Sequence, residues 1–281
     1  MKSKTLFAMS LMLFCTMVLY AQDLSLFRDA NGEYGYKNKT GKIIIEPKYD
    51  KAFEFSEGLA GVRQNGKWGF IDKTGREIVK PRYDYVGAFH NNIAQVNTGG
   101  KVDGYGNEDG GKWGLIDRTG KEIVPPKYDE VYRYFIEDYM IVKLNGKYGV
   151  IDNTGKETVP LKYDMIPNPE ESEPYPLQEV WLNGKAGFVE LKTGKEIVPL
   201  IYDDVVSFSE DLAAVNTGGK PQNFRVLGGK WGFVDTTGKE VIPLVYDIPF
   251  LSESLRFQNG KVQVSKDGST FFIDKTGKEV K

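Results

Sequence analysis

The chain has 281 residues, and its 37 basic and 39 acidic side chains give a net charge of −2 at neutral pH. Nucleic-acid-binding proteins need a surplus of basic residues on one face, so this balance argues against a nucleic acid partner. The single cysteine, Cys15, excludes an internal disulfide, and the single histidine leaves few routes to a metal site.

The first 21 residues have the pattern of a cleavable signal peptide. Lys2 and Lys4 form a basic start, and a mostly apolar run extends from Leu6 to Tyr20. This run is shorter than the ~20 residues that span a bilayer. Ala21 is a small residue suited to cleavage. We therefore expect residues 1–21 to be removed and the protein to be secreted, periplasmic or on the outer surface.

Removing residues 1–21 also removes Cys15, so the mature chain would contain no thiol nucleophile and no thiolate metal ligand. Lipid attachment at Cys15 is disfavoured because the bulky Phe14 precedes it. Without Lys2 and Lys4, 35 basic and 39 acidic residues remain, a net charge of −4. The mature chain contains no second apolar run of membrane-spanning length.

Residues 22–281 contain one unit written seven times, so we expect a single repeat domain. We define the anchor of each copy as the position that Trp68 occupies in the second copy. A Thr-Gly pair follows the anchor in every copy, and a Tyr-Asp pair closes the first six copies. The anchors are Tyr34, Trp68, Trp113, Tyr148, Ala186, Trp231 and Thr270.

Each unit has the pattern of β-strands. In the second copy, strands are predicted over 59–64 and 67–72 with Asn65-Gly66 as the turn, because both turn residues tolerate positive φ. Asp72 to Gly75 forms the next turn, and Pro81 is expected to end regular pairing. A short segment over 53–58 completes the unit.

The two-residue turn fixes which residues face each other. One face of the hairpin then carries Trp68 and Phe70, and the other carries Ala60, Val62 and Ile71. A lone hairpin is at best marginally stable in water. Because both faces are partly apolar, this hairpin needs neighbours on both sides, as in a stacked repeat array.

The fifth copy supports a packing role for the anchor aromatics. Its anchor is Ala186, but Trp181 lies on the preceding strand, directly opposite across the Asn183-Gly184 turn. The large ring has changed strands and stayed on the same face, which conserves volume in a packed layer.

Three segments interrupt the repeat, over 97–111, 167–176 and 216–229. The first and third both begin within "VNTGGK", and a block of three units has the pattern of a duplication. We interpret these two as possible partner-binding loops. Their candidate residues are Asn97, Thr98, Lys101, Asp103, Tyr105, Asn107, Asp109, Asn216, Thr217, Lys220, Asn223, Phe224 and Arg225.

The stretches "KWGFIDKTGREIVKPRYD", "KWGLIDRTGKEIVPPKYDE" and "KWGFVDTTGKEVIPLVYD" resemble the WG-repeat (KWG-repeat) family of bacterial proteins. The Ala-Gln ending of the leader resembles exported proteins of the Bacteroidota. The resemblance implies an all-β repeat protein, commonly without activity, and it implies no catalytic residues. The copies at the two ends of the chain depart from the motif, as the terminal units of repeat arrays usually do.

The fold class expected is all-β: a seven-copy array of β-meanders in an open curved or superhelical stack. A closed seven-bladed β-propeller is the alternative, since propellers have 4–8 blades. The open form is favoured because no terminal strand is left over to close a ring.

No set of residues for catalysis, cofactor or metal emerges. His90 is the only histidine, and the repeated aspartates, before the Thr-Gly turn and after the tyrosine, are interpreted as structural caps. The acidic loop over 102–111 lacks the order of an EF-hand, so Ca²⁺ binding is a minor alternative. The "NTGGK" glycines do not form a phosphate-binding loop.

The function expected is an exported, non-enzymatic repeat scaffold that binds a protein or polysaccharide partner. One alternative is a carbohydrate-active enzyme that uses carboxylates outside the repeat, such as Glu137, Asp138, Glu170 or Glu173. Another is a purely structural component of the cell envelope. The sequence leaves the oligomeric state open.

Overall fold

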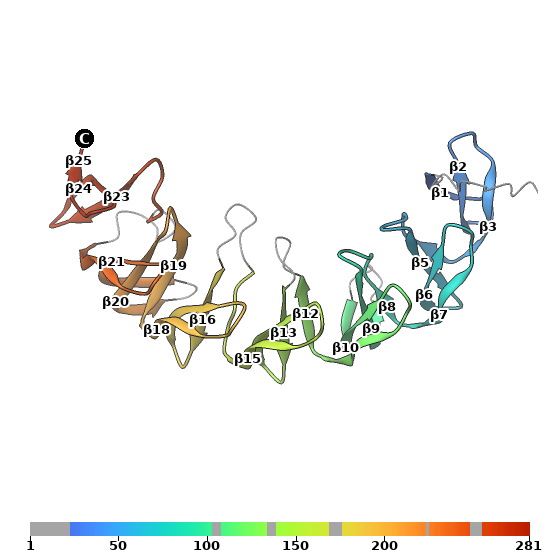
Figure 1. Ribbon diagram of the computed structural model, residues 1–281, viewed down its shortest axis with the longest axis horizontal. Coiled ribbons are helices and arrows are strands. Elements are labelled where there is room, and N and C mark those ends of the chain that lie inside the picture. Colours follow the sequence, from blue (N-terminus) through green and yellow to red (C-terminus); the bar gives the residue numbers. More distant parts are fainter. Residues whose placement is uncertain (1–22, 103–107, 134–138, 169–175, 223–224, 248–254) are drawn as a thin grey trace, which may run out of the picture.

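The computed structural model describes residues 23–102, 108–133, 139–168, 176–222, 225–247 and 255–281. Within these ranges the protein consists of strands and turns, arranged as seven small antiparallel sheets. The sheets follow one another in chain order along an open arc (Figure 1). The described part of the chain contains no helix long and apolar enough to cross a membrane.

The sheets are called first to seventh in chain order. The first three contain β1 (Leu24–Arg28), β2 (Tyr34–Asn38) and β3 (Ile43–Tyr49); β4 (Lys51–Ala52), β5 (Leu59–Gln64), β6 (Lys67–Asp72) and β7 (Glu77–Tyr83); and β8 (Tyr85–Val86), β9 (Ile93–Val102), β10 (Glu108–Asp117) and β11 (Glu122–Tyr128). The fourth and fifth contain β12 (Glu130–Arg133), β13 (Tyr139–Leu144), β14 (Lys147–Asp152) and β15 (Glu157–Tyr163); and β16 (Leu177–Leu182), β17 (Lys185–Glu190) and β18 (Glu196–Tyr202). The last two contain β19 (Asp204–Ser209), β20 (Leu212–Gln222), β21 (Arg225–Asp235) and β22 (Glu240–Tyr246); and β23 (Lys261–Lys266), β24 (Ser269–Asp274) and β25 (Glu279–Val280).

The predicted hairpin of the second unit is confirmed residue by residue. Strands β5 and β6 have the expected bounds, and Arg63 pairs with Trp68 and Val62 with Gly69. Asn65 has a φ of 53°, the left-handed conformation that an Asn-Gly turn supplies at little cost.

The expectation for Pro81 was wrong in one respect. Strand β7 does not stop there but continues to Tyr83, which pairs with Trp68. The register shifts between the Trp68–Tyr83 pair and the Phe70–Val79 pair, so the proline without an N–H falls where the ladder is already irregular. A Cβ on Gly69 would lie 2.3 Å from the Val79 carbonyl oxygen, which explains why the second residue of the Trp-Gly motif has no side chain.

The fourth strand of the second sheet lies before the segment 53–58 that was predicted to complete the unit. It is β4, and it begins directly after Asp50, so one residue alone separates the second sheet from the first. Ser56 then pairs with Leu59 to close the turn that leads into β5. The aspartate of the Tyr-Asp pair is likewise the single residue between β7 and β8, between β11 and β12, and between β18 and β19.

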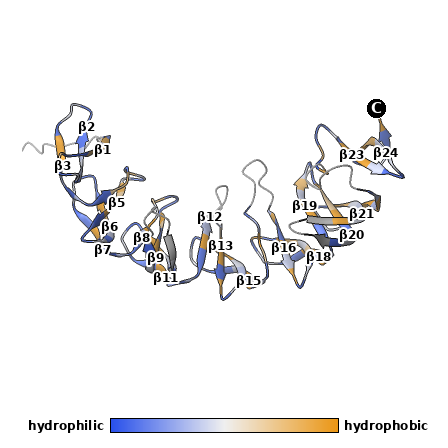
Figure 2. Ribbon diagram, turned by 180° about the vertical axis from the view of Figure 1, so that it is seen from behind, coloured by the Kyte–Doolittle hydropathy of each residue, from blue (hydrophilic) through white to orange (hydrophobic). Residues whose placement is uncertain are grey.

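Consecutive sheets pack face to face, as the two apolar faces of the hairpin predicted. Ala60, Val62 and Ile71 pack in a core with residues of the first sheet. Trp68 and Phe70 pack on the opposite side, in a core shared with the third sheet. Figure 2 shows that hydrophobic residues recur in the sheets along the whole arc. Each sheet thus depends on its neighbours for burial.

The array is open, and the alternative of a closed propeller was wrong. The first sheet has the order β1-β2-β3 and the seventh has the order β23-β24-β25, with no shared strand between them. They lie at opposite ends of the arc (Figure 1). Closure of the ring by a strand from the other end would place strands from both ends of the chain in one sheet. Among the described residues every sheet is built from strands that are consecutive in the sequence.

Candidate functional site

Two hairpins are longer than the repeat requires. The strands of the second sheet's hairpin have six residues each, whereas β9 and β10 have ten and β20 and β21 have eleven. The added residues are the segments 97–111 and 216–229 that interrupt the repeat in the sequence. These extensions are the candidate site.

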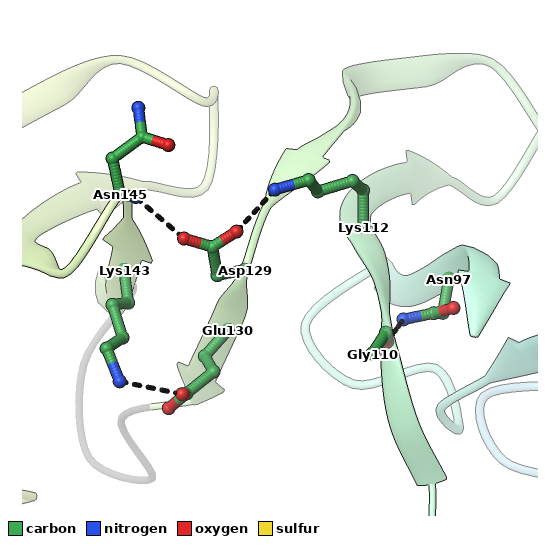
Figure 3. Close-up of polar contacts among 7 residues, drawn as sticks. All are labelled: Asn97, Gly110, Lys112, Asp129, Glu130, Lys143 and Asn145. Carbon is green, nitrogen blue, oxygen red and sulfur yellow. Dashed lines mark hydrogen bonds and ion pairs between the residues drawn. The ribbon is translucent and has the colours of Figure 1, made fainter. Parts of the chain in front are cut away.

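The asparagine that begins each extension is buried. Asn97 is 2% exposed and Asn216 is fully buried. The Nδ2 group of Asn97 donates to the Gly110 carbonyl oxygen at 3.3 Å (Figure 3), and that of Asn216 donates to Gly228 at 3.1 Å. These side chains therefore hold the backbone of the extension in place and do not face solvent.

The bend at the base of each extension explains the repeated "NTGG". The backbone N–H of Gly100 donates to Oδ1 of Asn97 at 3.1 Å, so the asparagine contacts both strands of the hairpin. A Cβ on Gly111 would lie 2.4 Å from the same Oδ1. The glycines are therefore required by the close approach of the asparagine, which fits a structural motif and not a phosphate-binding loop.

Other candidate residues lie nearer to solvent. Lys101, Thr217 and Lys220 are exposed, and Thr98 is half-buried. Asp103, Tyr105, Asn107, Asn223 and Phe224 lie outside the described residues, as do the side chains of Asp109 and Arg225.

The two extensions are not brought together. One belongs to the third sheet and the other to the sixth, and the strands labelled β9 and β20 lie on opposite limbs of the arc (Figure 1). Each extension therefore presents its own surface. The spacing agrees with a duplicated block of three units.

The aspartates that precede the Thr-Gly turns are caps, as predicted. Oδ1 of Asp117 accepts hydrogen bonds from the Thr119 hydroxyl at 2.6 Å and from the backbone N–H groups of Thr119 at 2.8 Å and Lys121 at 3.1 Å. The Thr119 hydroxyl, more than any other group, holds the pKa of Asp117 below its usual range. The same arrangement recurs at Asp72, Asp152, Asp235 and Asp274.

The aspartates of the Tyr-Asp pairs act differently from simple caps. Oδ1 of Asp129 pairs with the Lys112 ammonium of the third sheet, and Oδ2 accepts the backbone N–H of Asn145 in the fourth sheet at 2.7 Å (Figure 3). The Lys112 hydrogen bond is the main cause of the lowered pKa of Asp129. One carboxylate thus joins two sheets. The same clamp is formed by Asp84, Asp164 and Asp203.

The sequence pattern showed that these aspartates recur, but not that each contacts two sheets. The signal that identifies the clamp is the lysine before the Trp-Gly motif, which recurs with the aspartate 17 residues later in the Lys67–Asp84, Lys112–Asp129 and Lys147–Asp164 pairs.

Within the described ranges, no three histidine, cysteine, aspartate or glutamate side chains are grouped as a metal site. His90 is exposed, and its backbone pairs with Ile93 in a turn. The carboxylates of the enzymatic alternative, Glu137, Asp138, Glu170 and Glu173, lie outside the described residues, and so do residues 103–107 of the acidic loop over 102–111.

A comparison with family models matches the WG containing repeat over residues 34–68, 68–101, 113–148, 148–172, 187–220 and 231–269. The chain belongs to the WG containing repeat family. The six matched copies fall within the seven units of this WG repeat protein. A comparison with curated proteins gave no match.

Several solved structures share a distant likeness with this WG repeat protein. A eukaryotic initiation factor is 11% identical, with a TM-score of 0.39, over 92% of this chain and 73% of that one. AztD from Citrobacter koseri is 12% identical, with a TM-score of 0.35, over 92% and 78%. Hsv2 from Kluyveromyces lactis is 11% identical, with a TM-score of 0.34, over 78% and 70%.

Proposed function

We propose that this WG repeat protein is an exported, non-catalytic scaffold that binds a protein or polysaccharide partner through its extended hairpins. The observation that carries the proposal is the excess length of β9–β10 and β20–β21. Of the described residues in 98–112 and 217–230, none belongs to the hydrophobic cores between sheets. A segment that lies outside these cores, and whose base is hydrogen-bonded by a buried asparagine, is suited to presenting a surface.

Binding is favoured over catalysis by the state of the carboxylates. The described aspartates of both repeated series are occupied by turn or inter-sheet hydrogen bonds, which lower the pKa of Asp117, Asp129 and Asp203. A carboxylate held ionised in this way is a poor proton donor at neutral pH. The repeated environments also lack the contrast that separates a general acid from a general base.

Export is supported by residues 1–21, which have the pattern of a signal peptide. The proposed location is the periplasm, the outer surface or the medium. Fractionation of cells that produce the full chain would test it, together with the N-terminal sequence of the product. A product that begins at Met1 and stays in the cytoplasm would contradict export.

The binding proposal is tested by shortening each extension to the length of the second unit. Replacing Thr98–Lys112 by Gln-Asn-Gly-Lys copies the turn over 64–67, and the same exchange applies to Thr217–Lys230. The wild-type chain and both shortened variants would be applied to a glycan array and to immobilised envelope protein. A matched control is the wild-type hairpin with Asn65-Gly66 exchanged for Asp-Gly.

We expect the wild type to retain one ligand class that at least one shortened variant loses, while the melting temperatures remain within a few degrees. If both shortened variants fold and bind as the wild type does, the extended hairpins are not the binding surface. If the wild type binds nothing in either assay, a purely structural role is the better account.

A further inference from the structure

The last strand of each of the first six sheets ends in a tyrosine, and the first four of these tyrosines lie beneath a cation. The cation belongs to the preceding residue, and its charged group lies 4.8–5.2 Å from the centre of the tyrosine ring. The four tyrosines are 0–1% exposed. The pairs are Lys48–Tyr49, Arg82–Tyr83, Lys127–Tyr128 and Lys162–Tyr163.

The next sheet supplies a carboxylate to the same place. Glu122 of the third sheet pairs with Arg82 of the second at 3.3 Å and accepts the Tyr83 hydroxyl at 3.2 Å. Lys162 of the fourth sheet likewise pairs with Glu196 of the fifth at 3.0 Å. A cation between an aromatic ring and a carboxylate is therefore a contact that the chain forms repeatedly between its own sheets.

The fifth and sixth sheets lack the cation. Ile201 occupies the position of Arg82 and is 57% exposed, the largest exposed fraction of any large hydrophobic side chain in the described residues. Val245 occupies the same position in the sixth sheet. The tyrosines that follow, Tyr202 and Tyr246, are both 7% exposed. Loss of the cation thus accompanies greater exposure of the ring in both sheets.

The carboxylate of the arrangement is retained beside Tyr202. Glu240 lies on β22 of the sixth sheet, at the position that Glu122 holds in the third. Burial raises the pKa of Tyr202, and the nearby Glu240 charge raises it further. Glu240 is exposed, and within the described ranges it takes part in no ion pair. The ring and the carboxylate are therefore both present without the cation that joins them elsewhere.

We propose that Ile201, Tyr202 and Glu240 form a docking site for a lysine or arginine side chain from a basic segment of a partner protein. The side chain would lie over the Tyr202 ring and pair with Glu240, as the chain's own cation does in the second sheet. This surface goes beyond the proposed function, because it lies on the edge strands β18 and β22 and not on the extended hairpins.

A polypeptide is favoured over a small amine because the site has an apolar flank. Ile201 and Pro199 are both exposed on β18, next to the place for the cation. Residues that flank a basic side chain in a peptide would cover this apolar surface. Pro199 has no N–H, which disfavours the addition of a partner strand along β18 and favours contact through side chains.

The test is a titration of the full chain followed by nuclear magnetic resonance, with three probes: acetyl-Leu-Arg-Leu-amide, the matched acetyl-Leu-Gln-Leu-amide and agmatine. The arginine peptide is expected to shift the amide signals of Ile201, Tyr202 and Glu240. It should bind at least ~5-fold more tightly than the other two probes. Its affinity should fall as salt screens the charges.

The sharpest variant is Ile201→Lys, which supplies the missing cation from within the chain. It is expected to weaken binding of the arginine peptide at least ~10-fold, because the site is then filled and its charge neutralised. Pro199→Lys is the matched control, since it adds the same charge two residues earlier, where the second sheet has Lys80. It should bind within ~2-fold of the wild type. Lys162→Ile is the converse change and should create a second site in the fourth sheet.

Equal binding of the arginine and glutamine peptides would overturn the proposal, and so would an unchanged affinity in Ile201→Lys. Agmatine that binds as tightly as the arginine peptide would assign the site to a small amine and refute a protein partner. Glu240→Gln provides a second test if Ile201→Lys does not fold, with an expected loss of at least ~5-fold.

Two further outcomes separate this site from other binding. Sedimentation that rises with protein concentration in the wild type, but not in Ile201→Lys, would make a second copy of the chain the occupant and would overturn the proposal. A wild type that does not respond to the arginine peptide, but loses another ligand on hairpin shortening, would refute this site and leave the scaffold function standing.

Discussion

Trp181 pairs directly with Ala186 across the hairpin of the fifth sheet. In the second sheet the same two positions are held by Arg63 and Trp68, so the large ring lies on the opposite strand. Ala186 is fully buried, and Trp181 packs against the same core. In both sheets one large ring therefore occupies this pair of positions, supplied by β6 in the second sheet and by β16 in the fifth.

This relationship predicts strong coupling between the two positions. Ala186→Trp alone is expected to destabilise the protein by about 1–3 kcal/mol because two rings would compete for one space. Adding Trp181→Ala should recover at least ~1 kcal/mol of that loss. Urea unfolding of both single variants and the double variant gives the coupling free energy. Strictly additive effects would show that the rings do not share a layer.

Gly69 is expected to tolerate no side chain. In Gly69→Ala the new Cβ would lie 2.3 Å from the Val79 carbonyl oxygen, so the bulged strand pair must separate, at a cost of about 2–4 kcal/mol. Gly146→Ala is the matched control, because its φ is +78° but nothing lies within 4 Å of the new Cβ. Its expected cost is about 1 kcal/mol, from backbone strain alone. Similar melting temperatures for both variants would contradict the close approach.

The inter-sheet clamp at Asp84 predicts an acid-sensitive contribution to stability. Burial raises its pKa, but the hydrogen bonds from Lys67 at 2.5 Å and the Gly99 N–H at 2.8 Å outweigh burial and lower it below 3.8. A carboxyl whose pKa is lower in the folded than in the unfolded protein stabilises the fold at pH values above its unfolded pKa. This stabilisation is lost as the pH falls through its folded pKa.

Asp84→Asn is therefore expected to cost about 1 kcal/mol at pH 7 and little at pH 2. Glu46→Gln, at an exposed position on β3, is the control and should change stability little at either pH. Thermal unfolding at the two pH values is the measurement. A cost that is equal at both would mean that the ionised clamp contributes nothing.

Asp204 predicts the opposite pH dependence. Burial raises its pKa from 3.8 to about 6, although the Val205 N–H donates to it at 3.0 Å. A carboxyl whose pKa is higher in the folded protein destabilises the fold as the pH rises from about 4 to about 6. Asp204→Asn is expected to be more stable than the wild type by about 1–2 kcal/mol at pH 8, and no more stable at pH 4. A destabilised variant at pH 8 would refute this.

The hairpins could be predicted from the sequence because their determinants are local. Asn65-Gly66 sets the turn, the turn sets the register, and the alternation of residues then assigns Trp68 and Ile71 to opposite faces. Each of these assignments is found in the structure.

The contacts between sheets were harder to predict because they join residues of different units. Nothing local at Asp129 indicates that its second oxygen accepts the N–H of Asn145, in a different sheet. The two-residue strand β4 is also set by pairing with Arg63 and Val62, and its own sequence has no strand pattern. Openness depends on whether the ends meet, which is a property of the whole array.

The sequence located the hairpin extensions because they interrupt the repeat. It did not show which of their residues are buried and which are exposed. Asn97 and Asn216 have the polarity of surface residues, and in the structure they are buried hydrogen-bonding partners of the glycine bends. The exposed Phe272 was missed for a related reason. Its position is fully buried in the first six sheets and 36% exposed in the seventh, a difference that depends on contacts between sheets and not on a local pattern.

The openness of the array is tested most directly by one distance between its ends. Residues 22–281 contain no cysteine, so in that part of the chain Ser25→Cys on β1 and Ser269→Cys on β24 place spin labels at exposed positions in the first and seventh sheets. Facing sheets pack ~10 Å apart. Pulsed electron resonance is expected to give a label separation several times that spacing. A separation near one sheet spacing would mean that the first and seventh sheets meet in a closed ring, and would contradict the open arc.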